Sequence, residues 1–179
     1  MKMRSGFVLC AAMVLLMQVA RAGDSDVTIT TEKKRFENKA GPGSQPGSEE
    51  TTKTEQWGYS VTVENQTFKA LTNLQVKYII FYKHEQLGIK APPRKETKSG
   101  ASTIAQLDSL GKTSFDTDSV TLSKTSLNGP AGGYTYFANG AKSTAADTLS
   151  GVWVRIYQDG SLFAVYSYPA GLTTTEKWK

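Results

Sequence analysis

The residues that could perform acid–base or nucleophilic chemistry are few in this chain. Its one histidine is His84 and its one cysteine is Cys10. Nucleophilic catalysis needs a nucleophile, a base and a group that orients the base, so a triad would have to include His84. This histidine lies at the end of a predicted strand, in a polar run, where a solvated loop position is the simpler interpretation. The sequence therefore predicts no catalytic residue and a protein that is not an enzyme.

Closely spaced carboxylates occur in the run Asp116-Thr117-Asp118. Two carboxylates can hydrolyse a glycosidic bond or contribute to a calcium site. The run lacks the further oxygen ligands of a calcium loop, and its composition suits a turn or a strand edge; weak calcium binding is the alternative. Zinc-ligand spacings and glycine-rich phosphate loops are absent from the sequence, so we expect no cofactor and no metal.

Three aromatic residues form the first candidate binding surface. Tyr134, Tyr136 and Phe137 lie within residues 124–150, a stretch rich in Gly, Asn, Ser and Ala that we interpret as a long loop holding a small hairpin. Exposed aromatic rings stack on the C–H faces of sugars, which makes these residues a candidate glycan platform. The simpler alternative is that they fold over one end of the core.

The first 22 residues have the features of a secretory signal peptide. Met1-Lys2-Met3-Arg4 is the basic start, residues 6–17 are the apolar middle, and Ala20-Arg21-Ala22 is the small-residue cleavage pattern. The apolar run is shorter than the ~20 residues of a membrane-spanning helix. We expect an exported protein without a transmembrane segment, in the periplasm, on the outer surface or in the medium. A lipoprotein is the alternative because of Cys10, but Leu9 is too bulky for a lipid-attachment box.

Cleavage after Ala22 changes the charge and the redox chemistry of the chain. The whole sequence has 21 basic and 16 acidic residues, and loss of Lys2, Arg4 and Arg21 lowers the formal charge from +5 to +2. Such a balance is not typical of a nucleic-acid binder. Cys10 is lost too, so a cysteine-free domain must rely on its own core, which favours a bacterial envelope protein over a disulfide-stapled secreted domain.

Alternation of apolar and polar residues predicts β-strands along most of the remaining chain. Residues 57–64 have one apolar face, and residues 74–83 become apolar on both faces, as in a central strand. Shorter strands are predicted at residues 26–34, 103–107 and 119–122. About seven strands punctuated by turns predict an all-β fold, an immunoglobulin-like two-sheet antiparallel sandwich, with a barrel as the alternative.

The C-terminal residues predict a β-hairpin. Residues 151–157 and 162–168 flank Asp159-Gly160, a favoured pair for a type I′ turn. In a regular ladder the side chains of Ile156 and Val154 face the core together with those of Phe163 and Val165. The opposite face then carries the second candidate binding surface, for a partner: Trp153, Arg155, Tyr157, Leu162 and Tyr166.

A polar segment separates the first predicted strand from the others. Residues 37–55 contain almost no apolar side chain, so burial cannot offset the entropy lost on ordering them. We divide the chain into a signal peptide (1–22), an N-terminal strand with a flexible Gly/Pro/Ser/Glu-rich segment (23–55) and an immunoglobulin-like domain (56–179). The sequence leaves open whether the first strand joins the main sheet.

Four short motifs carry a resemblance to a known class. Residues 61–67 end a strand at the Asn65-Gln66-Thr67 turn, residues 71–76 open the next strand, Phe81-Tyr82 lie near its end, and residues 110–115 read Leu-Gly-Lys-Thr-Ser-Phe. These motifs resemble small bacterial immunoglobulin-like modules of the FxLYD and CARDB type. The layout is also similar to exported sandwich proteins of pili and other envelope assemblies. The resemblance implies adhesion, scaffolding or subunit contact, and no catalysis.

The predicted function follows from export, fold and the two aromatic surfaces. We expect a non-enzymatic interaction or structural module of a pilus-like or adhesive envelope assembly, with a protein partner or a second copy of the chain on the outer face of the hairpin. The alternative is a carbohydrate-binding module that uses the exposed loop aromatics.

Overall fold

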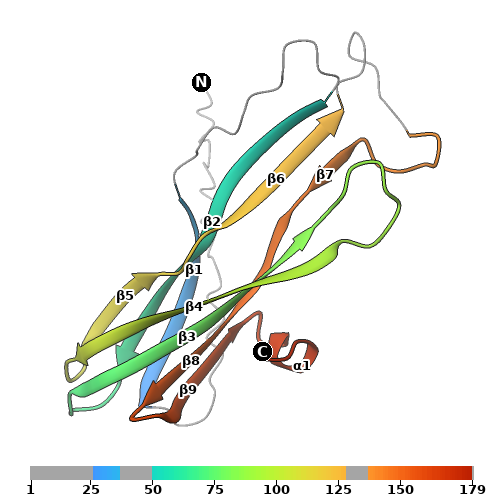
Figure 1. Cartoon of the computed structure of the whole chain (residues 1–179). Coiled ribbons are helices and arrows are strands. Elements are labelled where there is room, and N and C mark those ends of the chain that lie inside the picture. The colour runs from blue at the N-terminus through green and yellow to red at the C-terminus, as the bar shows by residue number, and fades with distance from the viewer. Residues whose placement is uncertain (1–25, 37–49, 128–136, 179) are drawn as a thin grey trace, which may run out of the picture.

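The computed structural model describes residues 26–36, 50–127 and 137–178, which form two antiparallel sheets packed face to face (Figure 1). Sheet A contains β1 (Val27–Arg35), β2 (Glu50–Asn65), β5 (Lys112–Asp116), β6 (Val120–Leu127) and β7 (Thr144–Ala146). Sheet B contains, in spatial order, β4 (Arg94–Leu107), β3 (Leu71–His84), β8 (Thr148–Gln158) and β9 (Ser161–Tyr168). The short helix α1 (Leu172–Thr175) follows β9. No helix in the described ranges has the length and hydropathy needed to cross a membrane, and the predicted signal peptide lies outside these ranges.

The strand order is that of an immunoglobulin-like sandwich. β1 pairs with one edge of β2, and β5 and β6 pair in succession with the opposite edge, so they act as one interrupted strand. β7 and β8 are separated only by Asp147, where the chain leaves sheet A and enters sheet B. If β5 and β6 are counted as one strand, and β7 and β8 as another, the nine strands of the described residues correspond to seven. The predicted all-β two-sheet fold is confirmed.

The core lies between the sheets and is built from alternate residues of β2, β3 and β8. Branched aliphatic side chains dominate it, because stiff β-branched residues pack well on a pleated surface. The residues with no exposed surface are Tyr59, Val61, Val63, Leu74, Val76, Ile80, Val152, Val154 and Ile156. Burial of each such aliphatic side chain contributes roughly 1.5–3 kcal/mol.

Several strands extend beyond their predicted limits. β2 begins at Glu50, inside the segment predicted to be flexible, and β4 begins at Arg94, nine residues before the strand predicted at residues 103–107. β6 and β7 occupy both ends of the predicted loop at residues 124–150. The side chains of these segments are largely exposed, so apolar alternation gives no signal there and backbone pairing holds the strands. β1 pairs with β2 along its whole length and so belongs to sheet A.

The turn of the C-terminal hairpin is confirmed. Asp159 and Gly160 have φ values of 49° and 81°, the two positive angles that a type I′ turn requires. Tyr157 pairs with Leu162, as the regular ladder predicts.

The register beyond that pair differs from the prediction. A β-bulge inserts Phe163, so that Val154 pairs with Tyr166 instead of Val165. One inserted residue reverses the faces of all that follow. Tyr166 therefore lies in the core and Val165 lies on the outer face of sheet B. The prediction that placed Tyr166 outside and Val165 inside is wrong.

Tyr59 is a polar exception within the apolar layer. Its hydroxyl is buried and has no hydrogen-bond partner in the part of the chain that the structure describes. Burial raises the pKa of Tyr59 well above its ordinary value of 10.0, and Tyr168 and Tyr166 add smaller contributions.

Replacement of Tyr59 tests the cost of this buried hydroxyl. We expect Tyr59→Phe to leave the free energy of unfolding at neutral pH unchanged or to raise it by up to about 1 kcal/mol. A group with a raised folded-state pKa contributes its stability below the unfolded-state pKa and loses it as the pH rises further. Urea unfolding near pH 7 and above about pH 10 should show a steeper alkaline loss in the wild type than in Tyr59→Phe. Equal alkaline losses in the two proteins would contradict this account.

Candidate functional site

The structure separates the residues of the predicted partner surface. Tyr166 is buried between the sheets. Trp153 is 6% exposed, because Trp178 packs edge-on against it with ring centroids 5.3 Å apart. The members that stay on the outer face of sheet B with some exposure are Arg155, Tyr157 and Leu162.

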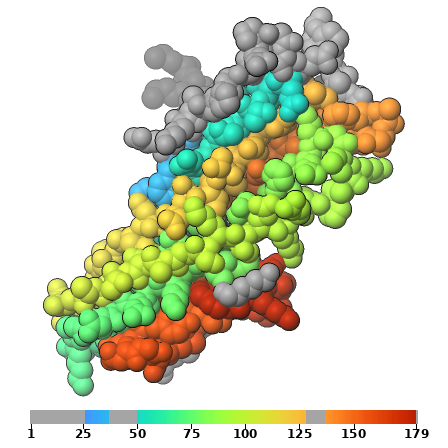
Figure 2. All heavy atoms as spheres, viewed as in Figure 1, coloured from blue at the N-terminus to red at the C-terminus, as the bar shows by residue number. Residues whose placement is uncertain are grey.

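The C-terminal segment of the chain covers part of this face. Leu172 of α1 and Trp178 pack on an apolar cluster formed by Ile79, Phe81, Trp153 and Val165. Figure 2 shows this segment, in red, against the green strands of sheet B. The surface that we expected to be free for a partner is therefore partly occupied within the chain.

The predicted glycan platform is described only at Phe137, since Tyr134 and Tyr136 lie outside the described residues. Phe137 packs on the β3–β4 loop at Gly88, where a Cβ atom would lie 3.0 Å from its ring. Gly88 has φ 74°, a conformation that suits glycine, and its carbonyl accepts a hydrogen bond of 2.9 Å from Asn139 Nδ2. Phe137 thus joins two loops.

His84 takes part in a partly buried polar cluster at the point where the chain changes sheet. Asp147 Oδ1 lies 2.8 Å from His84 Nδ1 and accepts a 3.1 Å hydrogen bond from the Glu85 N–H. Asp147 Oδ2 accepts a 2.9 Å hydrogen bond from the Ser123 N–H of sheet A. The Asp147 side chain is 5% exposed and that of His84 is 39% exposed. His84 is therefore not the free loop residue that we expected, and its partner carboxylate ties the two sheets together.

The carboxylates of Asp116 and Asp118 have different partners. Asp116 pairs with Lys34 of β1, and Asp118 Oδ2 accepts a 3.2 Å hydrogen bond from the Tyr78 hydroxyl. Thr117 between them is buried, and its Oγ1 accepts a backbone N–H of β2. Asp116 ends β5, and Thr117 and Asp118 lie in the interruption before β6, in agreement with the predicted turn or strand edge. Within the described ranges, no three His, Cys, Asp or Glu residues are grouped so as to hold a metal ion.

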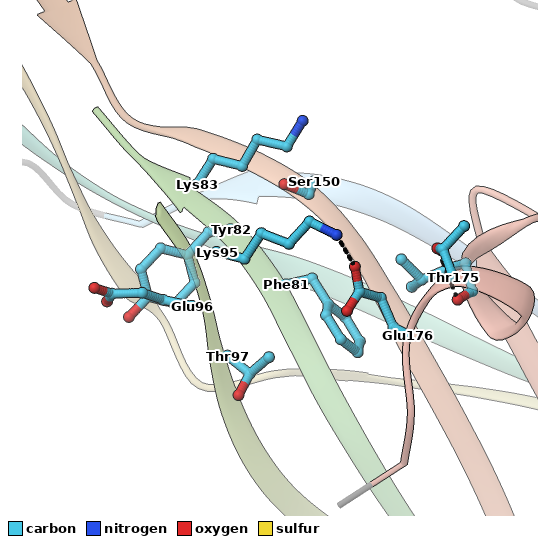
Figure 3. Close-up of a pocket in the computed structure, with 10 residues that line it drawn as sticks. Phe81, Tyr82, Lys83, Lys95, Glu96, Thr97, Ser150, Thr175 and Glu176 are labelled. Carbon is cyan, nitrogen blue, oxygen red and sulfur yellow. Dashed lines mark hydrogen bonds and ion pairs between the residues drawn. The ribbon is translucent and has the colours of Figure 1, made fainter. Parts of the chain in front are cut away.

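A cavity of about 230 Å³ lies between α1 and the strands β3, β4 and β8 (Figure 3). Phe81 and Leu172 are among its apolar lining residues, and on its rim Lys95 Nζ pairs with Glu176 Oε1 at 2.7 Å. Ser150, the residue inserted by a bulge in β8, also lines it. Because the rim ion pair links the C-terminal segment to β4, we interpret the cavity as part of the attachment of that segment.

The end of the sandwich formed by residues 65–70 and 108–111 is the candidate functional site, here called the loop surface. Asn65 organises it from a position that is 1% exposed. Its Nδ2 donates to the carbonyls of Lys69 and Asp108 at 2.7 and 2.9 Å, and its Oδ1 accepts the Thr67 N–H at 2.9 Å. One buried amide therefore fixes both loops, with its hydrogen-bonding groups satisfied. The predicted turn at residues 65–67 is confirmed.

Two large apolar side chains project from these fixed loops. Phe68 is 87% exposed and Leu110 is 55% exposed, and the two loops are joined by a 3.0 Å hydrogen bond from the Leu110 N–H to the Thr67 carbonyl. Leu110 also has φ 54°, a left-handed conformation that costs a bulky residue roughly 1–2 kcal/mol. Exposure and backbone strain on one apolar residue do not serve folding, and such outliers point to function. Figure 2 shows the β2–β3 connection, in teal, as the projecting lower tip.

The sequence contains a signal for one of these two residues. Residues 108–111 form a turn closed by the Gly111 N–H and the Asp108 carbonyl at 3.0 Å, and its third position prefers Gly or Asn when φ is positive. Leu110 is thus unusual for its place once the turn is located. Phe68 gives no such signal, because its exposure depends on the loop path that Asn65 imposes.

Comparisons with known proteins add little to this geometry. No protein-family model matches the chain, and no curated protein matches it. Among solved structures, the Northeast Structural Genomics Consortium target SoR45 aligns over 86% of this chain and 95% of its own, with 9% identity and a TM-score of 0.38. Similarity at this level supports no conclusion about the family or the function of the chain. The class of protein is defined here by strand order alone: an immunoglobulin-like β-sandwich.

Replacement of Asn65 tests the organisation of the loop surface. We expect Asn65→Ala to lower the free energy of unfolding by about 2–4 kcal/mol, because it leaves buried backbone groups of two loops unpaired. Urea unfolding measures the change, with Gln66→Ala, an exposed neighbour in the same loop, as the control expected to stay within about 0.5 kcal/mol. Equal effects of the two substitutions would show that Asn65 is not the organising residue.

Replacement of Leu110 tests the backbone strain. We expect Leu110→Gly to raise the free energy of unfolding by about 1 kcal/mol, since glycine adopts the positive φ without a steric penalty. Leu162→Gly is the matched control, because Leu162 is 52% exposed but lies in a strand, where glycine should lower stability by roughly 0.5–1 kcal/mol. Thermal unfolding of both variants decides the point, and a loss of stability in Leu110→Gly would argue against strain.

Proposed function

We propose that this chain is an exported, non-enzymatic interaction module that holds a protein partner through the loop surface, as part of a pilus-like or adhesive envelope assembly. Export to the periplasm, the outer surface or the medium is supported by the signal-peptide pattern of residues 1–22. The envelope assembly is supported by the resemblance to exported immunoglobulin-like modules.

The observation that carries the partner-binding proposal is the combination of fixed backbone and exposed apolar side chains at Phe68 and Leu110. Protein interfaces draw most of their affinity from a few large anchors that fill pockets on the partner. Anchors on loops that are already ordered lose less conformational entropy on binding. Asn65 provides this order before any partner is present.

The position of the loop surface in the fold agrees with this role. The connections β2–β3, β4–β5 and β8–β9 lie at the same end of the sandwich, since Leu74 near the start of β3 pairs with Gln158 at the start of the last turn. In sandwich proteins, loops held at one end of a rigid scaffold are a common place for recognition. Leu162, a member of the predicted partner surface, lies just beyond that turn and is exposed.

The carbohydrate-binding alternative based on Tyr134, Tyr136 and Phe137 stays a prediction. Among the described residues no contact favours it, because Phe137 packs on Gly88. We therefore put the protein partner first.

Site-specific photo-cross-linking on intact producing cells tests the proposed function. With a benzophenone amino acid at position 68, we expect an adduct of one defined mass, because the side chain enters a pocket of the partner. Ile89 is the matched control position, since it is 54% exposed and lies in the connection at the opposite end of β3. Addition of Leu110→Gly should reduce the adduct at position 68 without loss of folded protein.

Two outcomes would count against the proposal. Adducts of equal yield at positions 68 and 89 would indicate random collisions of exposed apolar side chains. No adduct at position 68, with the protein free and monomeric in the medium, would show that the loop surface has no partner there.

A further inference from the structure

We propose that the outer face of sheet B is a second binding site, independent of the loop surface, and that it takes an acidic polysaccharide. Its anionic groups, carboxylate or sulfate, would pair with Lys77 of β3 and Arg155 of β8.

The register of sheet B brings two cations together without a counter-charge. Lys77 and Arg155 are directly opposite each other in the antiparallel pair β3–β8, an arrangement that lowers stability for like charges. Within the described part of the chain, neither forms an ion pair with a carboxylate. The adjoining positions on this face are also uncharged: Ala101, Val165, Gln75, Tyr157, Ile79 and Trp153.

The guanidinium of Arg155 is held ready for an oxyanion. Its Cζ lies 4.9 Å from the ring centroid of Trp153 and 4.2 Å from that of Trp178, and contact with the two indole rings limits its movement. Its Nε is buried and has no hydrogen-bond partner within the described residues, and the terminal nitrogens form no ion pair there. Because Nε is shielded from solvent, the two terminal nitrogens are the ones left to bind two oxygens of one carboxylate or sulfate group.

The shape and composition of the face suit an extended sugar chain. Beside Lys77 the edge strand β4 presents the small exposed residues Ser99, Ala101 and Thr103, which leave room along the sheet. Tyr157 borders the cation pair, and Lys77 Nζ lies 5.2 Å from the centroid of its ring; aromatic rings next to charged donors are suited to sugars that carry acidic groups. Lys83 and Lys95 also lie on this face, close to α1, but Lys95 is paired with Glu176. The few unpaired cations that remain are too few for a nucleic-acid footprint, so we favour the polysaccharide.

Calorimetric titration of the exported chain tests the site. The probes are polygalacturonate, which carries carboxylates, dextran sulfate, which carries sulfates, and unmodified dextran as the neutral polymer. We expect one of the two anionic polymers to bind, with an affinity that falls as salt is added, and dextran not to bind. The comparison of the two anionic polymers identifies the acidic group.

Variants separate this site from a general effect of charge. Lys77→Gln should weaken binding about tenfold, since it removes one charge-assisted contact. Arg155→Lys keeps the charge but loses the planar fork, and should also weaken binding about tenfold. Lys83→Gln is the matched control: it lies on the same strand, six residues and ~20 Å away, makes the same change of charge, and should bind as the wild type does.

Three results would overturn the proposal. The first is that neither anionic polymer binds, and the second is that Lys77→Gln and Lys83→Gln weaken binding equally. The third is that single-stranded DNA binds more tightly than either polysaccharide at the same salt concentration. Should Arg155→Lys unfold because its stacking is disturbed, Lys77→Gln alone decides the outcome.

Discussion

Strand register is the physical constraint on which the rest of this structure depends. Because successive side chains point to opposite faces of a sheet, a shift of one residue exchanges buried and exposed positions along a whole strand. The pairing of β3 with β8 sets Val76 and Ile80 between the sheets, and the same pairing sets Lys77 beside Arg155 on the outer face. The core and the outer surface of sheet B are therefore two consequences of one register.

The sequence predicts the register well where burial enforces it and poorly where it does not. Val61, Ile80 and Val154, which alternation places in the core, have no exposed surface. Val165 lies on the outer face because a bulge at Phe163 intervenes. The alternation of apolar and polar residues does not reveal a bulge. Phe163 is apolar and Ala164 is small, so either residue could pair with Ile156 and face the core. Only residues 103–107 of the edge strand β4 were predicted, since the mostly polar side chains of residues 94–102 give no period of two.

The candidate site could be predicted only in part, because it depends on buried polar residues whose partners are backbone groups. Asn65 was recognised as a turn residue, but its hydrogen bonds to Asp108 join loops far apart in sequence. Asp147 has the same character where the chain changes sheet, since it links the last residue of β3 and the residue that follows to β6. Such contacts follow from the fold and cannot be derived from local composition. Each residue makes its part of the sandwich rigid by satisfying backbone groups that would otherwise be buried without partners.

Several residues of this chain are unfavourable in their burial, backbone conformation or charge pairing, and the fold offsets the cost of some of them but not of others. Buried Asn65 and Asp147 are compensated by hydrogen bonds, and the positive φ at residue 88 is adopted by a glycine, for which it has no steric cost. Leu110 keeps a strained backbone and an exposed side chain, and Lys77 and Arg155 face each other without a counter-charge within the described residues, although aromatic rings contact both cations. Folding gains nothing from either feature, and local conflicts without an internal benefit are expected at functional positions. This difference, more than exposure alone, separates the two proposed binding surfaces from the rest of the molecule.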